Sequence, residues 1–174
     1  MSNEKIVNLT VNGRAIKLAV PSHHTLLEAL RHEGYVDIKS GCEKGDCGAC
    51  AVLMDGDPID SCLTLAWHAE GRSITTIHGL GNDENPDPVQ TAFIETGAAQ
   101  CGYCTPGMII AAKALLQDNP DPSLDDIKRG LGGNLCRCTG YTRIFEAVEV
   151  AAAEMRGAGE AASKKVSQKE GAAA

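Results

Sequence analysis

The cysteines constrain this chain more than any other feature, because they fall into two sets of four with different spacing. The second set contains a C-x2-C pair at the start of a predicted helix and a C-x-C pair farther along the chain. Thiolates are strong ligands for metal ions and iron–sulfur clusters. The sequence therefore predicts two sites of four thiolates: Cys42, Cys47, Cys50 and Cys62 in the first, and Cys101, Cys104, Cys136 and Cys138 in the second.

Disulfide bonding is the alternative use for so many cysteines, and it depends on the compartment. The N-terminus passes from Met1 directly into a strand-like pattern, without the charged, apolar or twin-arginine segments of a secretion signal. No apolar run reaches membrane-spanning length. We therefore expect a cytoplasmic protein, in which clustered cysteines act as metal ligands.

Composition limits both the partners and the core. The formal net charge is -7 and the only lysine pair is Lys164-Lys165, so the chain lacks the basic block that nucleic acid or an anionic membrane would require. Aromatic residues make up only 3% of the 174 residues, so any core must be aliphatic. Two small aliphatic domains, each stiffened by a metal centre, fit this composition.

The first half of the chain has the pattern of a small α+β domain. Alternating apolar residues over 7–20 predict a β-hairpin, and a capping-box signature at Thr25 predicts a helix that ends before Gly34. Short strands are expected at 51–54 and 74–77. A helix packed on a small sheet accounts for this order of elements.

The first cysteine set has the spacing C-x4-C-x2-C followed by one distant cysteine, which is the plant-type arrangement for a 2Fe-2S cluster. A planar diiron cluster needs thiolates from several directions, so three come from a tight loop and the fourth from a separate element. Three glycines are expected to give this loop positive φ angles and to turn backbone N–H groups toward the sulfurs: Gly41, Gly45 and Gly48.

Beyond a polar segment rich in turn formers, the apolar period becomes helical. The pattern predicts four short helices: one from Val89, one with Thr105 as N-cap, one started by Ser123, and one that Gly157 stops. We therefore expect a ferredoxin-like domain at 1–80, a linker at 81–87, a helical domain at 88–157 and a flexible tail at 158–174.

Together with their flanking residues, the two cysteine sets resemble one family. It is the iron–sulfur small subunit of the xanthine dehydrogenase, aldehyde oxidase and carbon monoxide dehydrogenase group of molybdenum hydroxylases, and the resemblance covers roughly residues 4–157. It implies an α+β chain, with a β-grasp 2Fe-2S ferredoxin domain followed by a four-helix 2Fe-2S domain. The motifs that carry it are Gly41-Cys42-x-x-Gly45-x-Cys47-Gly48-Ala49-Cys50, Cys62-Leu63, Pro88-Val89-Gln90-x-Ala92-Phe93, Gln100-Cys101-Gly102-Tyr103-Cys104-Thr105-Pro106-Gly107-Met108 and Asn134-Leu135-Cys136-Arg137-Cys138-Thr139-Gly140-Tyr141.

The resemblance also implies a role for the chain and for its residues. The chain would be the electron-transfer subunit of an oxidoreductase, without substrate chemistry of its own. Gln100 would hydrogen-bond the pterin of a molybdopterin cofactor. The implied partners are a large molybdopterin-binding subunit and a medium FAD-binding subunit, in a heterotrimer or a dimer of heterotrimers. The first cysteine set would hold the cluster nearer the flavin and the second set the cluster nearer the molybdenum. Relatives oxidise aldehydes, purines, other N-heterocycles and similar small molecules, and the sequence leaves this choice open.

Other interpretations of the cysteines have to be weighed beside this one. Zinc fits the number of thiolates, but C-x4-C-x2-C is poor spacing for a zinc ribbon. A Rieske centre requires paired histidines in the cluster loops. A stand-alone two-cluster ferredoxin or a redox-sensing regulator is the alternative function. The helical domain argues against a simple carrier, and the lack of a basic patch argues against a nucleic-acid-binding regulator. All five histidines lie outside the cluster loops: His23, His24, His32, His68 and His78.

Overall fold

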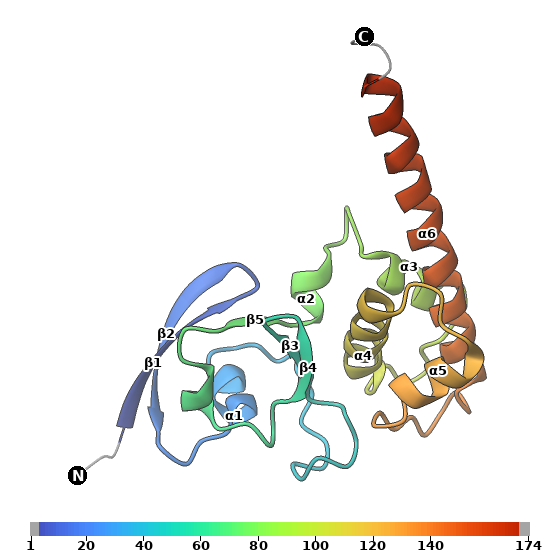
Figure 1. Cartoon of the computed structure of the whole chain (residues 1–174). Coiled ribbons are helices and arrows are strands. Elements are labelled where there is room, and N and C mark those ends of the chain that lie inside the picture. The colour runs from blue at the N-terminus through green and yellow to red at the C-terminus, as the bar shows by residue number, and fades with distance from the viewer. Residues whose placement is uncertain (1–3, 171–174) are drawn as a thin grey trace.

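Two domains lie side by side in this computed structural model, which describes residues 4–170 and the side chains of residues 4–157. A five-stranded sheet with a packed helix forms the first domain, and helices form the second (Figure 1). The last helix, α6 (Thr142–Glu170), extends beyond the rest of its domain. The domain limits given above stay predictions, as does the flexible tail, of which residues 171–174 lie outside the described part of the chain.

The sheet of the first domain has the β-grasp arrangement. Its strands stand in the order β2-β1-β5-β3-β4, with β1 parallel to β5 and the other pairs antiparallel. The predicted hairpin is confirmed, and its turn has positive φ at both Asn12 and Gly13, as a tight two-residue turn requires. The strands are β1 (Glu4–Val11), β2 (Arg14–Pro21), β3 (Ala51–Met54), β4 (Asp57–Asp60) and β5 (Ser73–Thr75).

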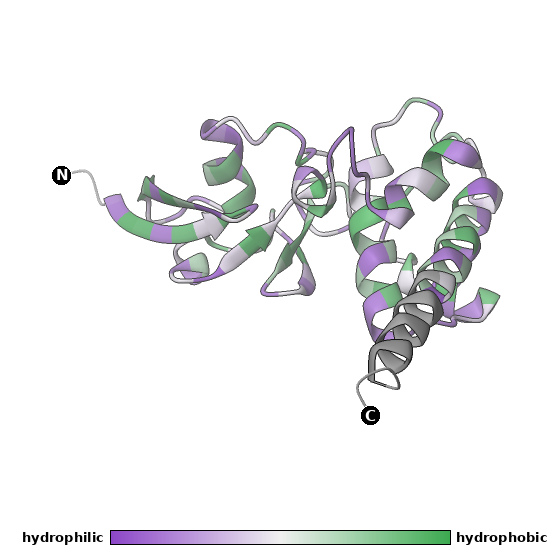
Figure 2. Cartoon of the chain, turned by 90° about the horizontal axis from the view of Figure 1, so that it is seen from above, coloured by the Kyte–Doolittle hydropathy of each residue, from purple (hydrophilic) through white to green (hydrophobic). Residues whose placement is uncertain are grey.

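Helix α1 (Leu26–His32) packs on this sheet through an aliphatic core. The capping box between Thr25 and Glu28 is confirmed, with Thr25 Oγ1 accepting from the Glu28 backbone N–H at 3.2 Å. Alternate residues of β1 face the helix, and Figure 2 shows this alternation as bands of colour along the strand nearest the N-terminus. A short 3-10 helix, η1 (Ala66–Ala69), closes one side. The buried side chains include Val7, Leu9, Val11, Leu18, Leu26, Leu30, Val52 and Ile74.

The second domain packs four helices around a second aliphatic core. Helices α3 (Pro88–Glu95) and α5 (Leu124–Gly130) start at capping boxes formed by Asp87 with Gln90 and by Ser123 with Asp126. Helix α4 (Thr105–Asp118) lies between them and the first domain, and α6 covers α3. The predicted four helices are therefore present, and their buried side chains include Val89, Phe93, Met108, Ile109, Leu116, Ile127, Ile144 and Val148.

The structure differs from the sequence-based expectations at three helix ends. Ile77 was expected in a strand but begins α2 (Ile77–Leu80), where it packs against the second core. Cys104 is the N-cap of α4, so Thr105 is its first residue, and Pro106 still lies in the first turn, where a missing N–H costs nothing. The last helix continues through Gly157, because one glycine costs a helix only about 1 kcal/mol.

Helix α4 joins the two domains, because it is buried on more than one side. Its Met108 and Ala112 face the helical core, whereas Ile110 and Ala114 pack against Leu53 of β3 in the first domain. This double burial sets α4, and the cysteines at its start, firmly against the ferredoxin-like domain.

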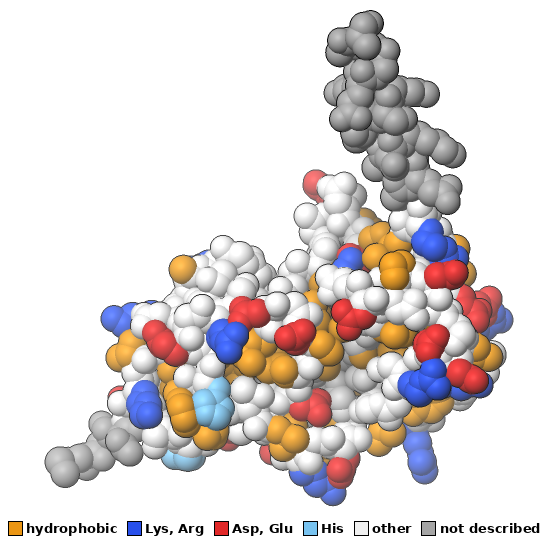
Figure 3. Space-filling model, viewed as in Figure 1, with side chains coloured by type: hydrophobic (Ala, Val, Ile, Leu, Met, Phe, Trp, Pro, Cys, Tyr) orange, Lys and Arg blue, Asp and Glu red, His pale blue; other side chains and the backbone are white. Residues whose placement is uncertain are grey.

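None of the helices in the described part of the chain has the length and apolar character needed to cross a membrane. Figure 3 shows acidic and basic side chains interspersed over the visible face, without a continuous patch of one sign.

Candidate metal centres

The first candidate centre is a loop between α1 and β3 that contains three of its four cysteines. Gly45 and Gly48 have φ angles of 82° and 66°, as expected for a loop that must turn sharply around a cluster. Gly41 does not have a positive φ, contrary to expectation. It is needed for space instead, because a Cβ at this position would lie 2.8 Å from Cys47 Sγ.

The four sulfurs of the first centre meet as two pairs. The Cys42 thiol interacts with that of Cys47, and the Cys50 thiol with that of Cys62. The backbone N–H of Lys44, together with the N–H of Asp46 at 3.2 Å from Cys42 Sγ, lowers the pKa of Cys42 to about 7. Burial raises the pKa of Cys50 to about 12. One pair is therefore partly open to solvent, and the other lies inside the domain.

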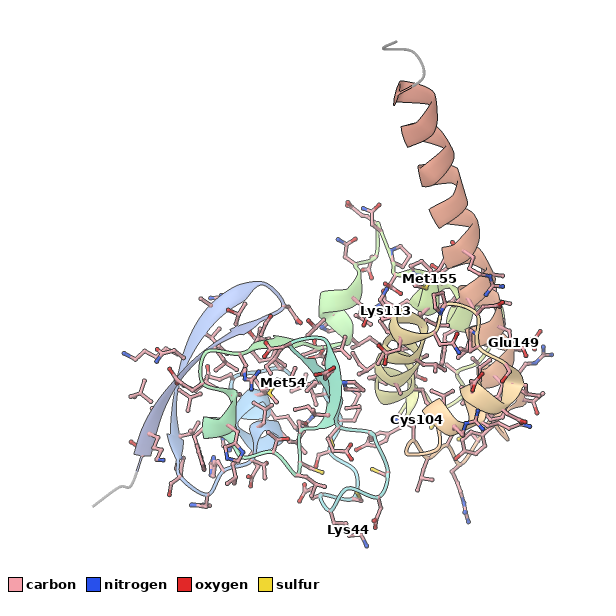
Figure 4. The ribbon with its side chains drawn as sticks, in the orientation of Figure 1. Lys44, Met54, Cys104, Lys113, Glu149 and Met155 are labelled. Atoms are coloured by element: carbon pink, nitrogen blue, oxygen red, sulfur yellow. The ribbon has the colours of Figure 1, made fainter. Side chains whose placement is uncertain are left out.

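The second candidate centre assembles at the start of α4 and in the loop before α6. The Cys101 thiol interacts with that of Cys138, and the Cys104 thiol with that of Cys136. Burial raises the pKa of Cys104 to about 12. Figure 4 shows Cys104 at the end of α4 that lies on the same side of the molecule as the loop bearing Lys44. The structure thus brings together all four cysteines that the sequence assigns to this centre.

Donors to sulfur are built into the second loop. Burial acts to raise the pKa of Cys136, but the Thr139 hydroxyl at 3.2 Å and the Thr139 N–H at 3.5 Å from its sulfur oppose this and bring the pKa to about 7. Such donors stabilise thiolate charge and raise the reduction potential of a cluster that the thiolate holds. Tyr141 accepts from the Cys136 backbone N–H at 3.0 Å and so fixes the orientation of the loop.

The number of thiols at each centre fits a two-iron cluster. Each iron of a 2Fe-2S cluster takes two protein ligands, so the four thiols of either centre would hold one such cluster. The buried thiols would lose their protons on binding, because a coordinated thiol is deprotonated.

Gln100 lies beside the second centre, with its side chain exposed at the molecular surface. Its Nε2 donates to the carbonyl oxygen of Cys138 at 3.1 Å. The amide is therefore held next to two cysteines, Cys101 by sequence and Cys138 by hydrogen bond. Its predicted contact with a pterin stays a prediction.

The sequence patterns did not predict the hydrogen bonds that connect the two centres. Leu135 N–H donates to the Cys47 carbonyl at 3.0 Å, and Asn134 Nδ2 donates to the Gly48 carbonyl at 3.0 Å. Tyr103 donates from its hydroxyl to the Ser40 carbonyl, so it joins the loops as well as standing beside the second centre. One signal was available: Gly107 lies in the first turns of α4, and a glycine inside a helix often marks a close backbone approach.

Comparison with known proteins identifies both domains. Residues 9–73 match the family model for a 2Fe-2S iron–sulfur cluster binding domain, and residues 76–149 match that for a second 2Fe-2S binding domain. The chain is 47% identical to the nicotinate dehydrogenase small FeS subunit of Eubacterium barkeri, over 86% of this chain and 96% of that one. It is 46% identical to the xanthine dehydrogenase iron–sulfur-binding subunit of Escherichia coli O157:H7, over 82% of this chain and 91% of that one.

A solved structure shows the same fold at high sequence identity. A chain of quinoline 2-oxidoreductase from Pseudomonas putida 86 superimposes with a TM-score of 0.83 and 44% identity, covering 90% of this chain and 99% of that one. Because the match covers nearly the full relative, both the domains and their order are shared.

Proposed function

The chain belongs to the family of iron–sulfur small subunits of molybdenum hydroxylases, and on this premise we propose that it relays electrons between two partner subunits through two 2Fe-2S clusters. Electrons would pass from a molybdopterin site in a large subunit to FAD in a medium subunit, during oxidation of an aldehyde, a purine, another N-heterocycle or a similar small molecule. The chain is accordingly the iron–sulfur subunit of an oxidoreductase and not its substrate-binding part.

One observation carries the proposal: the loops that hold the two sets of paired thiols are hydrogen-bonded to each other. The contact between Leu135 N–H and the Cys47 carbonyl joins a cysteine of the first set to the residue just before a cysteine of the second. Two redox groups held this close can exchange electrons. A chain that used its cysteines only for stability would have no need to join the two loops.

When bound, each cluster supplies one-electron redox chemistry at its two irons. The residues of this chain then have three tasks. Paired thiols hold the irons, backbone and Thr139 donors stabilise sulfur charge, and the buried sulfurs of Cys50 and Cys62 keep water from one side of the first centre. Gln100, held by the Cys138 carbonyl, presents a side-chain amide toward the surface where a large subunit would bind.

The proposal is tested by the metal and flavin content of the native complex purified on this chain. We expect about four irons for each molybdenum and each FAD, since each chain would hold two 2Fe-2S clusters. Iron without molybdenum or flavin in a stable isolated chain would favour a free two-cluster carrier. Zinc in place of iron would overturn the electron-transfer role.

A further inference from the structure

Three buried segments meet where the two domains contact each other, and each is close to a cysteine. Gly48 follows Cys47 in the first loop, Asn134 precedes Cys136 by two residues, and Gly107 follows Cys104 by three. We call the contact of Gly48, Asn134 and Gly107 the loop junction. It connects one cysteine-bearing loop of the first domain with both cysteine-bearing segments of the second.

The side chain of Asn134 supplies the polar contact of the loop junction. It is only 7% exposed, and its Nδ2 donates to the Gly48 carbonyl at 3.0 Å across 86 residues of sequence. The Gly48 carbonyl also accepts from the Ala51 N–H of its own loop at 3.2 Å, so the Asn134 amide is its donor from the other domain. This bond to a second buried donor favours one position of the first loop relative to the second. The backbone of Asn134 is fixed on its own side, because its N–H donates to the Leu131 carbonyl at 2.9 Å.

The loop junction is closely packed at its two glycines, beside a cavity of about 340 Å³ that is lined in part by Gly48, Gly133 and Asn134. A Cβ added to Gly107 would overlap the Gly48 carbonyl, and a Cβ added to Gly48 would lie 2.7 Å from the Gly133 carbonyl. The Leu135 N–H bond to Cys47 stands directly beside this contact. The two loops are therefore joined by one backbone bond, from Leu135, and by one side-chain bond, from Asn134, and a substitution can remove only the second.

We propose that Asn134 is a positioning residue, which sets the separation and relative orientation of the two thiolate centres through its bond to Gly48. This inference rests on the proposed electron relay and refines it. Electron transfer between two centres weakens steeply with their separation, so a residue that fixes the separation also fixes the transfer rate. The hydrogen bond of the Asn134 side chain goes to a backbone carbonyl and not to a thiol.

The test uses the full chain in its native complex, with the Asn134→Asp and Asn134→Ser variants. Asp keeps the size of the side chain but places a carboxylate oxygen against the Gly48 carbonyl, whereas Ser removes the amide without adding charge. Asn85→Asp is the matched control, because Asn85 is exposed in the linker, away from both centres. Three quantities are measured: iron content, the magnetic splitting of the electron paramagnetic resonance signals when both clusters are reduced, and the rate at which an electron equilibrates between the two centres after a reducing pulse.

We expect both Asn134 variants to keep the iron content of the parent and to lose part of the splitting, because spin coupling falls steeply with distance. The rate at which an electron equilibrates between the two centres after a reducing pulse should fall with it. Asn85→Asp should match the parent in all three measurements.

The outcomes separate this inference from the proposed function. Two reducible iron signals with parent splitting in both Asn134 variants would overturn the positioning role and leave the relay intact. A parent complex without two reducible iron signals would overturn the relay, and the inference with it. If the Asp variant does not assemble, the Ser variant decides the outcome.

Discussion

The backbone N–H of Leu135 donates to the carbonyl oxygen of Cys47 at 3.0 Å, so the loops of the two cysteine sets are in direct contact. The two residues are far apart in the sequence and come from different domains. Helix α4 supports the same arrangement, because it packs through Ile110 and Ala114 against Leu53 of β3, and β3 directly follows the loop of the first set. Two cysteines of the second set come just before α4. The fold thus places the two centres next to each other.

Replacing Cys104 by Ser should remove one centre and leave the other. The iron content should fall from about four to about two per chain, because each 2Fe-2S cluster needs its four ligands. Within the complex, substrate should still reduce the molybdenum centre, while turnover with the final acceptor should be lost. Iron analysis and steady-state kinetics measure these effects, and normal turnover in this variant would contradict the relay.

The sequence predicts those features that depend on local chemistry. Cysteine spacing grouped the eight thiols into two sets, and hairpin and capping signals located β1, β2, α1 and α5, because turn and cap residues act over a few positions. Helix α3 was predicted from its apolar period, and its cap at Asp87 was not. The N-cap of α4 was wrong by one residue, because Cys104 replaces the usual oxygen-bearing cap beside the second centre.

Sequence patterns did not predict the packing between the two domains. Nothing local distinguishes Asn134 from any other loop asparagine, and its partner Gly48 is 86 residues away. Likewise, the apolar pattern of α4 predicts one buried face, but Ile110 and Ala114 are buried on another, against Leu53. These contacts depend on how the two domains pack against each other. The apolar period of a single helix gives no information about that packing.

Substituting Gly107 by Ala should destabilise the chain by about 1–3 kcal/mol, as overpacking of a close contact does. The added methyl would overlap the Gly48 carbonyl, and backbone must move to admit it. Gly157→Ala is the matched control in α6, where no atom lies within 4 Å of the added Cβ. That control should gain about 0.5–1 kcal/mol from higher helix propensity. Midpoints of anaerobic urea unfolding measure both, and equal shifts would argue against the tight contact.

Lys113→Met should destabilise the helical domain by about 3 kcal/mol, since it leaves a buried carboxylate without its cation. Lys113 Nζ lies 2.5 Å from Asp87 Oδ2, and the two side chains are 15% and 8% exposed. Asp87 also caps α3 through the Val89 N–H at 3.0 Å. Lys128→Met removes an exposed pair with Asp125 and should change stability by less than about 1 kcal/mol. Urea unfolding compares the stability of the two variants. A similar loss of stability in both would show that the buried Lys113–Asp87 pair contributes no more than the exposed one.

Gln100→Ala should slow electron delivery from the large subunit without disturbing the clusters. The Gln100 side chain is exposed and oriented by its bond to the Cys138 carbonyl, and it contacts no thiol directly in the hydrogen bonds of the described chain. Iron content and both cluster signals should therefore match the parent, while the rate at which substrate-derived electrons reach the clusters falls. Gln117→Ala, on an exposed position of α4, is the control and should leave that rate unchanged. An unchanged rate in Gln100→Ala would show that the Gln100 side chain takes no part in electron transfer between the subunits. Loss of iron would show that it supports the second centre instead.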